Sequence, residues 1–306
     1  MNAIECHDLV RTFGRTRAVG GLTFTVPAGS FYALLGPNGA GKTTALKLLL
    51  NLQRPDTGRS SVLGCDSRRL TAAHFQRIGY VAEGQDLPEW MTVAQLLAYC
   101  RPLYPTWDEA LAVRLLTMFD LPADRAIKKL SRGMKMKAAL LSNLAFRPEL
   151  MVLDEPFSGL DPLVRDEFIQ GLLELPTDDR PRTFVVSSHD IDEVEKLADQ
   201  VGFMAAGRML VHESADGLRA RFRRVEILGD DLAGPVGAPP PAWSEIRQPA
   251  PNVLQFVHSA FAAATTAGEL AARFPRAEVT FRAMSLREIF LVLARQQRTT
   301  ANQEAA

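Results

Sequence analysis

Short runs of β-branched and aromatic residues alternate along this chain with segments whose apolar positions recur at helical spacing. The runs that predict strands are Leu22 to Val26, Phe31 to Leu35, Leu150 to Leu153, Thr183 to Ser187 and Val201 to Met204. Helical spacing is found in Lys42 to Leu52 and in the set Ile191, Val194, Leu197 and Ala198. Strands that alternate with helices in this way predict an α/β fold built on a mostly parallel sheet.

Two stretches before residue 150 depart from this alternation. Ile4 to Leu9 and Leu22 to Val26 both alternate and lie close together, which predicts an antiparallel β layer at one edge of the fold. From about residue 87 to residue 147 the strand signals vanish and helical patterns dominate, including a stretch from Asp108 to Asp120. We interpret this part as a helical subdomain inserted into the sheet domain.

The composition changes again after about residue 220, where residues 234–241 are too rich in glycine and proline for a helix or a central strand. Beyond them, Val253 to Val257 and Glu278 to Arg282 predict strands. Leu286, Ile289, Phe290 and Leu293 predict an amphipathic helix. We therefore predict a main domain over 1–220 and a small appended α+β domain over 221–306.

The net charge and the cysteine positions limit which binding partners and which cellular compartment we expect for the chain. Its 306 residues include 35 basic and 35 acidic ones, so no net positive field attracts nucleic acid or an anionic membrane. Cys6, Cys65 and Cys100 lie far apart without CxxC spacing, which argues against a disulfide framework and a structural zinc site. We find neither a leader peptide nor about eighteen consecutive apolar residues, and we expect a cytoplasmic protein that does not span a membrane.

A glycine-rich segment between the second strand run and the first helix carries the clearest chemistry. It fits the phosphate-binding pattern GxxxxGK[ST], with a strand before it and a helix after it. The glycines allow successive N–H groups to point at phosphate oxygens, the lysine reaches the β- and γ-phosphates, and the first threonine binds Mg²⁺. The nine residues are Gly36, Pro37, Asn38, Gly39, Ala40, Gly41, Lys42, Thr43 and Thr44. The pattern predicts nucleotide binding and leaves the type of nucleotide enzyme open.

Polar residues follow two other predicted strands. The apolar run that starts at Leu150 ends in Asp154 and Glu155, and the run that starts at Thr183 is followed by His189. A buried parallel strand carries such groups to the edge of a phosphate site. We expect Asp154 to hold Mg²⁺ and Glu155 to orient the attacking water, while His189 can reach the γ-phosphate.

Two further motifs complete a resemblance to a known family. Leu130-Ser131-Arg132-Gly133-Met134 stands before a helical stripe and about twenty residues ahead of Asp154, and Ser158-Gly159-Leu160-Asp161-Pro162 follows it. In this order, the motifs resemble those of the nucleotide-binding subunits of ATP-binding cassette (ABC) transporters, over roughly residues 3 to 220. The resemblance implies a P-loop NTPase fold of the ABC ATPase type that binds ATP and Mg²⁺.

The resemblance also implies roles for individual residues. Ser131, a helix N-cap, and Gly133 would cap the γ-phosphate bound by an opposite subunit, so that two copies or homologous subunits enclose two ATP molecules head to tail. Asp161 falls in the family's D-loop and His189 at its switch histidine. Phe13 lies where the family places an aromatic residue that stacks on adenine.

The chain departs from the family pattern at two places. Arg132 replaces a usual glycine of the signature, and Met134-Lys135 replaces its glutamine-containing end. At the Q-loop, Glu83 replaces the usual glutamine, with Gln85 two positions later. A carboxylate at position 83 can approach Mg²⁺, but it adds negative charge beside the triphosphate. Either Glu83 has a shifted role, or Gln85 substitutes for it as the residue near Mg²⁺, or Glu83 is a solvated residue of the loop. These variants and the appended domain that ends in residues 285–290 are similar to a branch associated with ABC-2-type bacterial exporters.

We therefore expect an ATP-hydrolysing subunit, peripheral on the inner face of the cell membrane, that powers export through a separate integral membrane subunit. Three apolar residues in or beside the loop from Tyr80 to Trp90 are either anchors for that partner or core residues, namely Leu87, Trp90 and Met91.

The alternative function is a soluble ABC-type ATPase acting on nucleic acid or ribosomes, and a third possibility is a module that binds ATP without turnover. A single cassette, the lack of a heptad run and zero net charge argue against the alternative, and the retention of Glu155 and His189 argues against the third.

Overall fold

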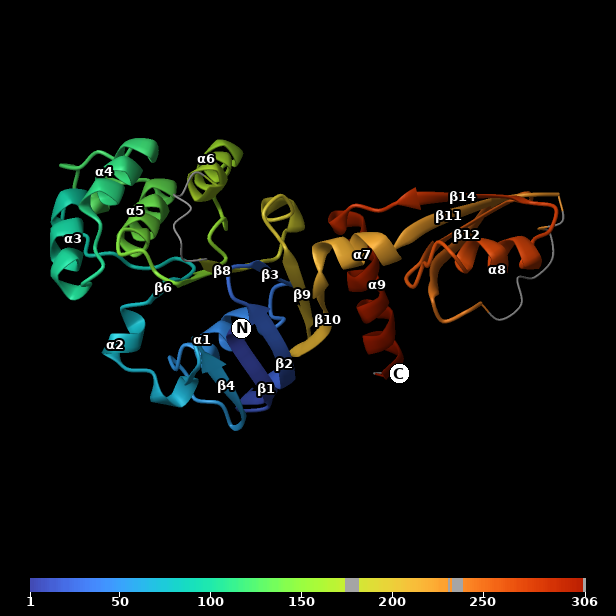
Figure 1. Cartoon of the computed structure of the whole chain (residues 1–306), viewed down its shortest axis with the longest axis horizontal. Helices are drawn as coiled ribbons and strands as arrows, with labels where there is room; N and C mark the ends of the chain where they lie inside the picture. The colour runs from blue at the N-terminus through green and yellow to red at the C-terminus, as the bar shows by residue number, and fades with distance from the viewer. Residues whose placement is uncertain (174–181, 231, 233–238, 305–306) are drawn as a thin grey trace. The chain divides into compact units, whose positions relative to one another are not determined.

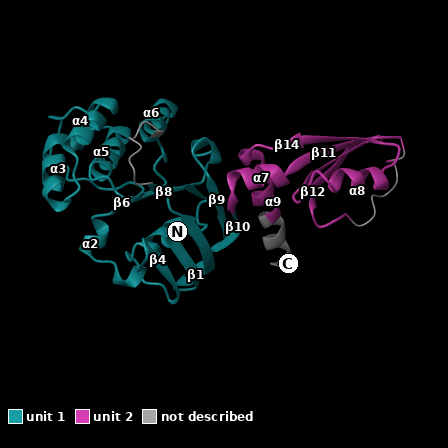
Figure 2. Cartoon of the chain, in the orientation of Figure 1, with its two compact units in different colours: residues 1–212 teal, residues 213–306 magenta. Residues whose placement is uncertain are grey.

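The computed structural model describes residues 1–173, 182–230, 232 and 239–304. The chain forms two compact units, Met1–His212 and Glu213–Ala306 (Figure 2). No helix in these described ranges is both long enough and apolar enough to cross a bilayer.

Unit 1 contains a six-stranded sheet in the order β10-β9-β3-β8-β7-β6. β3 pairs in parallel with β8 and β9, and β7 pairs in parallel with β6 and β8, which confirms the predicted parallel sheet. The carboxyl ends of β3, β7 and β8 therefore meet at one edge. The strands are β3 (Phe31–Leu35), β6 (Ile78–Val81), β7 (Leu150–Asp154), β8 (Thr183–Ser188), β9 (Gln200–Ala205) and β10 (Arg208–Ser214).

A second sheet in unit 1 has the order β2-β1-β4-β5, and its strands are β1 (Asn2–Phe13), β2 (Thr16–Pro27), β4 (Thr57–Val62) and β5 (Cys65–Asp66). β1 and β2 pair antiparallel, as predicted from their alternation. β4 was not predicted, because its sequence TGRSSV is mostly polar and only Ser60 and Val62 are buried. Helix α1 (Lys42–Leu49) contributes Leu46 to a core that also contains Phe24 and Val152.

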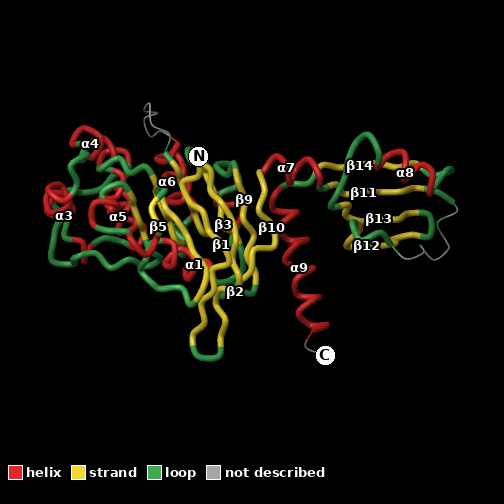
Figure 3. Tube along the Cα trace, turned by 60° about the horizontal axis from the view of Figure 1, so that its bottom comes forward, coloured by secondary structure: helices red, strands yellow, loops and turns green. Residues whose placement is uncertain are grey.

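Helices gather at one end of unit 1 (Figures 1 and 3). Residues 87–147, all of them described, contain helices and 3-10 turns and no strand, which confirms the predicted helical subdomain. The subdomain contains α3 (Val93–Cys100), α4 (Glu109–Met118) and α5 (Arg132–Leu144), while α2 (Ala72–Phe75) precedes it and α6 (Pro162–Leu173) follows β7. The 3-10 turns of the chain's described part lie at Ser67–Arg69, Arg101–Leu103, Ile127–Lys129 and Ile191–Glu193.

The predicted helix through Ile191, Val194, Leu197 and Ala198 is wrong. The chain forms a 3-10 turn over Ile191–Glu193 and then separate turns. The Asp190 carboxylate accepts a hydrogen bond from the Asp192 N–H, and the buried Glu193 side chain accepts one from the Ser188 hydroxyl. These bonds hold the segment against the end of β8. The apolar spacing thus reflects burial in successive turns rather than a continuous helix.

Unit 2 is built on an antiparallel sheet in the order β12-β13-β11-β14, whose strands are β11 (Arg223–Leu228), β12 (Trp243–Ala250), β13 (Val253–His258) and β14 (Glu278–Ala283). The Trp243 and Phe256 rings stack with centroids 3.8 Å apart, and α8 (Thr266–Arg273) adds Leu270 to the same core. Helix α7 (Ala215–Arg221) contacts α9 (Leu286–Glu304). The strands predicted for β13 and β14 and the helix predicted for α9 are confirmed. Of the glycine- and proline-rich stretch, residues 234–238 lie outside the described part.

We predict that Gly202→Ala destabilises unit 1 by about 1–3 kcal/mol, because overpacking forces buried groups apart. A Cβ on Gly202 would lie 2.2 Å from the Tyr32 hydroxyl oxygen. The Tyr32 side chain is fully buried and its hydroxyl lies 3.1 Å from His212 Nδ1, so the ring has no free space to enter. Urea unfolding followed by circular dichroism measures the change.

Gly20→Ala is the matched control, because it also adds a methyl group to a strand of unit 1. A Cβ there would lie 3.3 Å from Arg17 Nε, at the end of an exposed side chain that can shift. We expect a change of about 0.5 kcal/mol or less for this surface substitution. Equal losses of stability in the two variants would contradict the packing argument.

Candidate nucleotide-binding and catalytic site

The glycine-rich loop connects β3 to α1 and brings backbone N–H groups to the sheet edge. Gly41, the N-cap of α1, has φ +98°, and a Cβ there would lie 2.2 Å from the Ala18 carbonyl oxygen. Glycine is therefore required by both conformation and space. No side chain caps this end of α1, so the N–H groups of its first turn and its dipole favour an anion.

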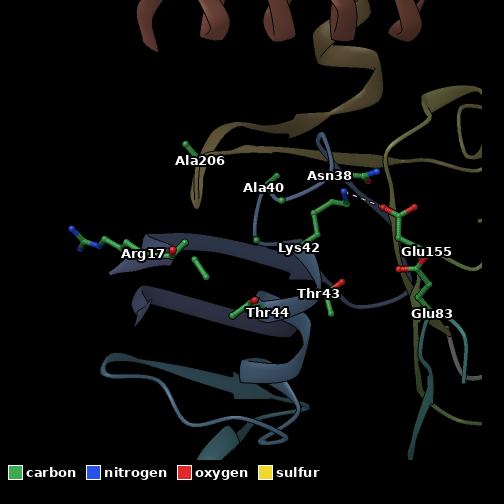
Figure 4. Close-up of a pocket in the computed structure, with 13 residues that line it drawn as sticks. Arg17, Asn38, Ala40, Lys42, Thr43, Thr44, Glu83, Glu155 and Ala206 are labelled. Carbon is green, nitrogen blue, oxygen red and sulfur yellow. Dashed lines mark ion pairs between the residues drawn. The ribbon is translucent and has the colours of Figure 1, made fainter. Parts of the chain in front are cut away.

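Lys42 lies buried at the centre of the site. Its Nζ donates hydrogen bonds to the carbonyl oxygens of Gly36, at 2.7 Å, and Pro37, at 3.3 Å. The same Nζ lies 3.0 Å from Glu155 Oε1, which joins the glycine loop to the residue that follows β7 (Figure 4). Both side chains of this ion pair are less than 10% exposed, so solvent screens their attraction little.

Asp154 lies behind Thr43 at the end of β7. Its Oδ1 accepts hydrogen bonds from the Thr43 hydroxyl at 3.0 Å and from the Ser187 hydroxyl at 2.7 Å. Burial raises the pKa of Asp154, and the two hydroxyl bonds partly oppose that increase. The Ser187 oxygen also accepts a hydrogen bond of 2.9 Å from the Glu155 N–H, so Ser187 aligns both acidic residues. Ser187 lies at the end of β8, where the sequence places two serines, but no sequence pattern gave it a role.

Glu155 connects Lys42 with His189. One carboxylate oxygen faces Lys42, and the other lies 2.8 Å from His189 Nδ1. The Glu155 backbone has φ +48°, a left-handed conformation that is rare outside glycine and asparagine and is often found at functional sites. The His189 side chain is 42% exposed, while that of Glu155 is 7% exposed. The arrangement places a buried carboxylate between a fixed cation and a solvent-accessible imidazole.

A cavity of about 550 Å³ opens beside these groups. Its lining includes the predicted residues Asn38, Gly39, Ala40, Gly41, Lys42, Thr43 and Thr44, together with Glu83 and Glu155 (Figure 4). Gly36, Pro37, Asp154 and His189 are not in the lining but contact Lys42, Thr43 or Glu155 directly. Thr16, Arg17, Ala18 and Ala206 also line the cavity. No sequence motif marks these four residues. The first three begin β2 and the last lies in the turn after β9, and both segments reach the glycine loop only through the tertiary fold.

Glu83 and Gln85 have different surroundings. Glu83 lines the cavity, and its Oε1 accepts a hydrogen bond of 3.0 Å from the Ser158 hydroxyl. Gln85 Oε1 instead accepts a hydrogen bond of 3.2 Å from the Ala82 N–H and does not line the cavity. Of the two candidates, Glu83 is thus the one that faces the nucleotide-sized space.

Four further predicted residues lie outside the cavity lining. Phe13 is 42% exposed, with the Arg11 guanidinium 4.7 Å from its ring centroid. Ser131 caps α5 by accepting a hydrogen bond from the Met134 N–H, and Gly133 follows in the first turn of that helix. Asp161 caps α6 by accepting a hydrogen bond from the Val164 N–H. Residues 131–133, which we call the Ser131 segment, therefore do not reach the cavity of their own chain.

Comparisons with known proteins agree with this geometry. A family model described as ABC transporter matches residues 19–158. The chain is 35% identical over 238 residues to a Nod factor export ATP-binding protein I of Burkholderia lata, covering 75% of this chain and 78% of the relative. It is 36% identical over 216 residues to a sulfate/thiosulfate import ATP-binding protein of Yersinia pseudotuberculosis, covering 68% of this chain but only 59% of that protein.

A solved structure described as the ATP-binding subunit of an ABC transporter superposes with a TM-score of 0.61 at 26% identity, over 71% of this chain and 92% of that one. The family match, these relatives and the fold confirm the resemblance that the motifs predicted. The chain belongs to the ABC transporter family, as one of its ATP-binding subunits.

Proposed function

We propose that this chain hydrolyses ATP to ADP and phosphate in a Mg²⁺-dependent reaction and thereby drives transport through a separate membrane subunit. The observation that carries the proposal is the continuous set of contacts from Lys42 through Glu155 to His189. These contacts join a phosphate-binding loop to a carboxylate positioned to act on water. A module that only binds nucleotide has no need for this second part.

The phosphates of ATP would bind along the glycine loop and the first turn of α1. Lys42 now bonds to Gly36, Pro37 and Glu155. An entering triphosphate would exchange these partners for β- and γ-phosphate oxygens, which accept stronger, charge-assisted hydrogen bonds. Glu155 would then be released from Lys42 while it stays beside His189.

The residues around Asp154 fit a magnesium ion. Asp154 is 1% exposed, and among the residues that the structure describes its hydrogen-bond donors are the uncharged hydroxyls of Thr43 and Ser187. A buried carboxylate without a directly bonded cation favours a divalent ion, and carboxylate and hydroxyl oxygens are the ligands that Mg²⁺ prefers. We propose Thr43 and Asp154 as its protein contacts, with Glu83 as the additional carboxylate. Bound magnesium would neutralise charge on the β- and γ-phosphates.

Glu155 would orient the attacking water and accept its proton. As the water oxygen bonds to the γ-phosphorus, the bond from that phosphorus to the β–γ bridging oxygen breaks and ADP leaves. His189 holds Glu155 through Nδ1 and, because its side chain is partly exposed, is available to the γ-phosphate.

Ser131 and Gly133 would serve the nucleotide of a second copy of the chain or of a homologous subunit. Ser131 caps the first turn of α5 and is exposed, whereas Gly133 is buried in that turn. The Ser131 end of α5 would act as a second helix terminus that attracts the γ-phosphate. Two chains arranged head to tail would then enclose two ATP molecules. We assign Phe13 to the adenine ring in this arrangement.

We propose export as the direction of transport, because the relative from Burkholderia lata is named for export and the motifs resemble an exporter branch. The membrane subunit would dock on the helical subdomain. Trp90 is 78% exposed, whereas Leu87 is buried and Met91 is partly buried. Trp90 is therefore the apolar anchor of this set, and the chain would sit on the inner face of the membrane.

We predict that Glu155→Gln lowers ATP turnover by about 10² to 10⁴-fold, the typical contribution of a general base. The variant keeps the size of the side chain and should accumulate as an ATP-bound dimer. Phosphate release measures turnover, and size-exclusion chromatography with MgATP measures dimerisation. Glu149→Gln is the matched control, since Glu149 precedes β7 and pairs with Arg77 away from the cavity. Undiminished turnover in Glu155→Gln would remove Glu155 from this role.

We predict that Asp154→Asn raises the Mg²⁺ concentration for half-maximal ATPase activity by about tenfold or more, because the amide lacks the charge that attracts a divalent ion. Titration of Mg²⁺ at saturating ATP measures the shift. Chelation of Mg²⁺ should abolish turnover in the parent chain. Turnover that persists without divalent ions would contradict the magnesium assignment.

A further inference from the structure

Residues 158–161, in the second half of the loop between β7 and α6, touch two segments that are distant in the sequence. One is the cavity-lining residue Glu83, and the other is Arg132 in the first turn of α5. We call residues 158–161 the D-loop. The two residues that it touches are also two of the positions where the chain departs from the family pattern.

Ser158 makes the contact on the cavity side. Its hydroxyl donates a hydrogen bond of 3.0 Å to Glu83 Oε1, and its backbone N–H donates one of 3.1 Å to the Glu155 carbonyl oxygen. Ser158 thus touches both acidic residues of the cavity lining. Because a carboxylate accepts stronger hydrogen bonds than an amide, Glu83 holds this hydroxyl more firmly than a glutamine would.

Gly159 makes the contact on the helix side. It has φ +69°, and a Cβ there would lie 2.5 Å from Arg132 Nη1 and 2.8 Å from Arg132 Cζ. The guanidinium therefore lies directly against the Gly159 backbone. A glycine at position 132 would leave this space to water and would not touch the loop.

The first turns of α5 and α6 reinforce this contact. A Cβ on Gly133 would lie 3.0 Å from Val164 Cγ1 and 3.7 Å from Leu160 Cδ2, so the start of α5 packs closely on the D-loop and α6. One turn later, the buried Lys137 forms an ion pair with Glu167 of α6. The beginning of α5 is thus packed against both the D-loop and α6.

We propose that Glu83, Ser158, Gly159 and Arg132 form a clasp that links the nucleotide cavity of a chain to its own Ser131 segment. A change in what the Glu83 carboxylate binds reaches Ser158, then the D-loop backbone, then Arg132 at the start of α5. Ser158 and Arg132 are positioning residues in this scheme. The consequence for turnover rests on the proposed function, in which Ser131 meets the nucleotide held by a second chain.

The link itself is tested in the full-length chain without nucleotide, by amide hydrogen exchange at Met134 and Lys135. Both N–H groups bond to Ser131, at its hydroxyl and carbonyl oxygens respectively. We expect Ser158→Ala and Glu83→Ala each to speed this exchange by about tenfold, the effect of losing a hydrogen bond to a charged group. Arg132→Ala should act in the same direction, while Ser158→Thr, which keeps the hydroxyl, should restore slow exchange.

The double variant decides between a link and two local effects. If the residues act as one clasp, Glu83→Ala with Ser158→Ala exchanges no faster than the more affected single variant. Ser30→Ala and Arg114→Ala are matched controls: the Ser30 hydroxyl donates one loop hydrogen bond to Pro27, and Arg114 is an exposed residue of α4. The clasp is disproved if the single variants exchange at the rate of the parent chain. It is also disproved if the accelerations of the two single variants multiply in the double variant.

A second measurement tests whether the clasp affects ATP-driven dimerisation. It also distinguishes failure of the clasp from failure of the proposed function. In the Glu155→Gln background, Ser158→Ala should raise the ATP concentration for half-maximal dimerisation by about tenfold, as measured by analytical ultracentrifugation. If Glu155→Gln itself stays monomeric with MgATP, the proposed function fails, while the exchange data still decide the clasp. If it dimerises and Ser158→Ala changes nothing, the clasp has no role in closure and the proposal fails.

Discussion

The parallel register of β3, β8 and β7 is the constraint on which the site depends. Leu35 pairs with Ser188, and Asp154 pairs with Ser187, so three strands end together at one edge. The loops that leave this edge carry the glycine segment, the acidic pair and His189. Because side chains alternate between the two faces of a strand, a shift of one residue would turn Asp154 away from Thr43 and leave its charge buried without donors.

Buried charge follows from this geometry and explains much of the local structure. Lys42, Asp154 and Glu155 are all buried, and isolated charges at such positions cost several kcal/mol each. The Lys42–Glu155 ion pair and the hydroxyls of Thr43 and Ser187 offset part of that cost. In the function that we propose, a nucleotide with its cation would take over these interactions without first reorganising the strands, which is the preorganisation that a phosphoryl-transfer site requires.

The two departures from the family pattern at Glu83 and Arg132 can be explained only from the contacts that these residues make in the tertiary structure. Glu83 and Arg132 are separated by almost fifty residues in the sequence, yet they contact adjacent residues of one loop. In a cavity that binds a triphosphate, as we propose for this one, an acidic residue is unfavourable unless a donor or a cation compensates its charge. Ser158 supplies the donor, and Arg132 supports the loop that carries Ser158. The two unusual residues are therefore compatible with a working site rather than signs of a degraded one.

The sequence by itself determined the parallel sheet, the helical subdomain, the glycine loop and the acidic pair after Leu153, because each depends on residues that are contiguous or regularly spaced. Tertiary structure decided the rest. The segment at Ile191, where a helix was expected, forms separate turns, and the mostly polar segment Thr57–Val62 pairs as β4. Glu83 rather than Gln85 faces the cavity. The tertiary structure also placed Arg17 in the cavity lining. Folding brought Ser187 to Asp154 and Ser158 to Glu83. These outcomes depend on contacts between segments that strand pairing and core packing bring together, and local pattern carries no information about such distances.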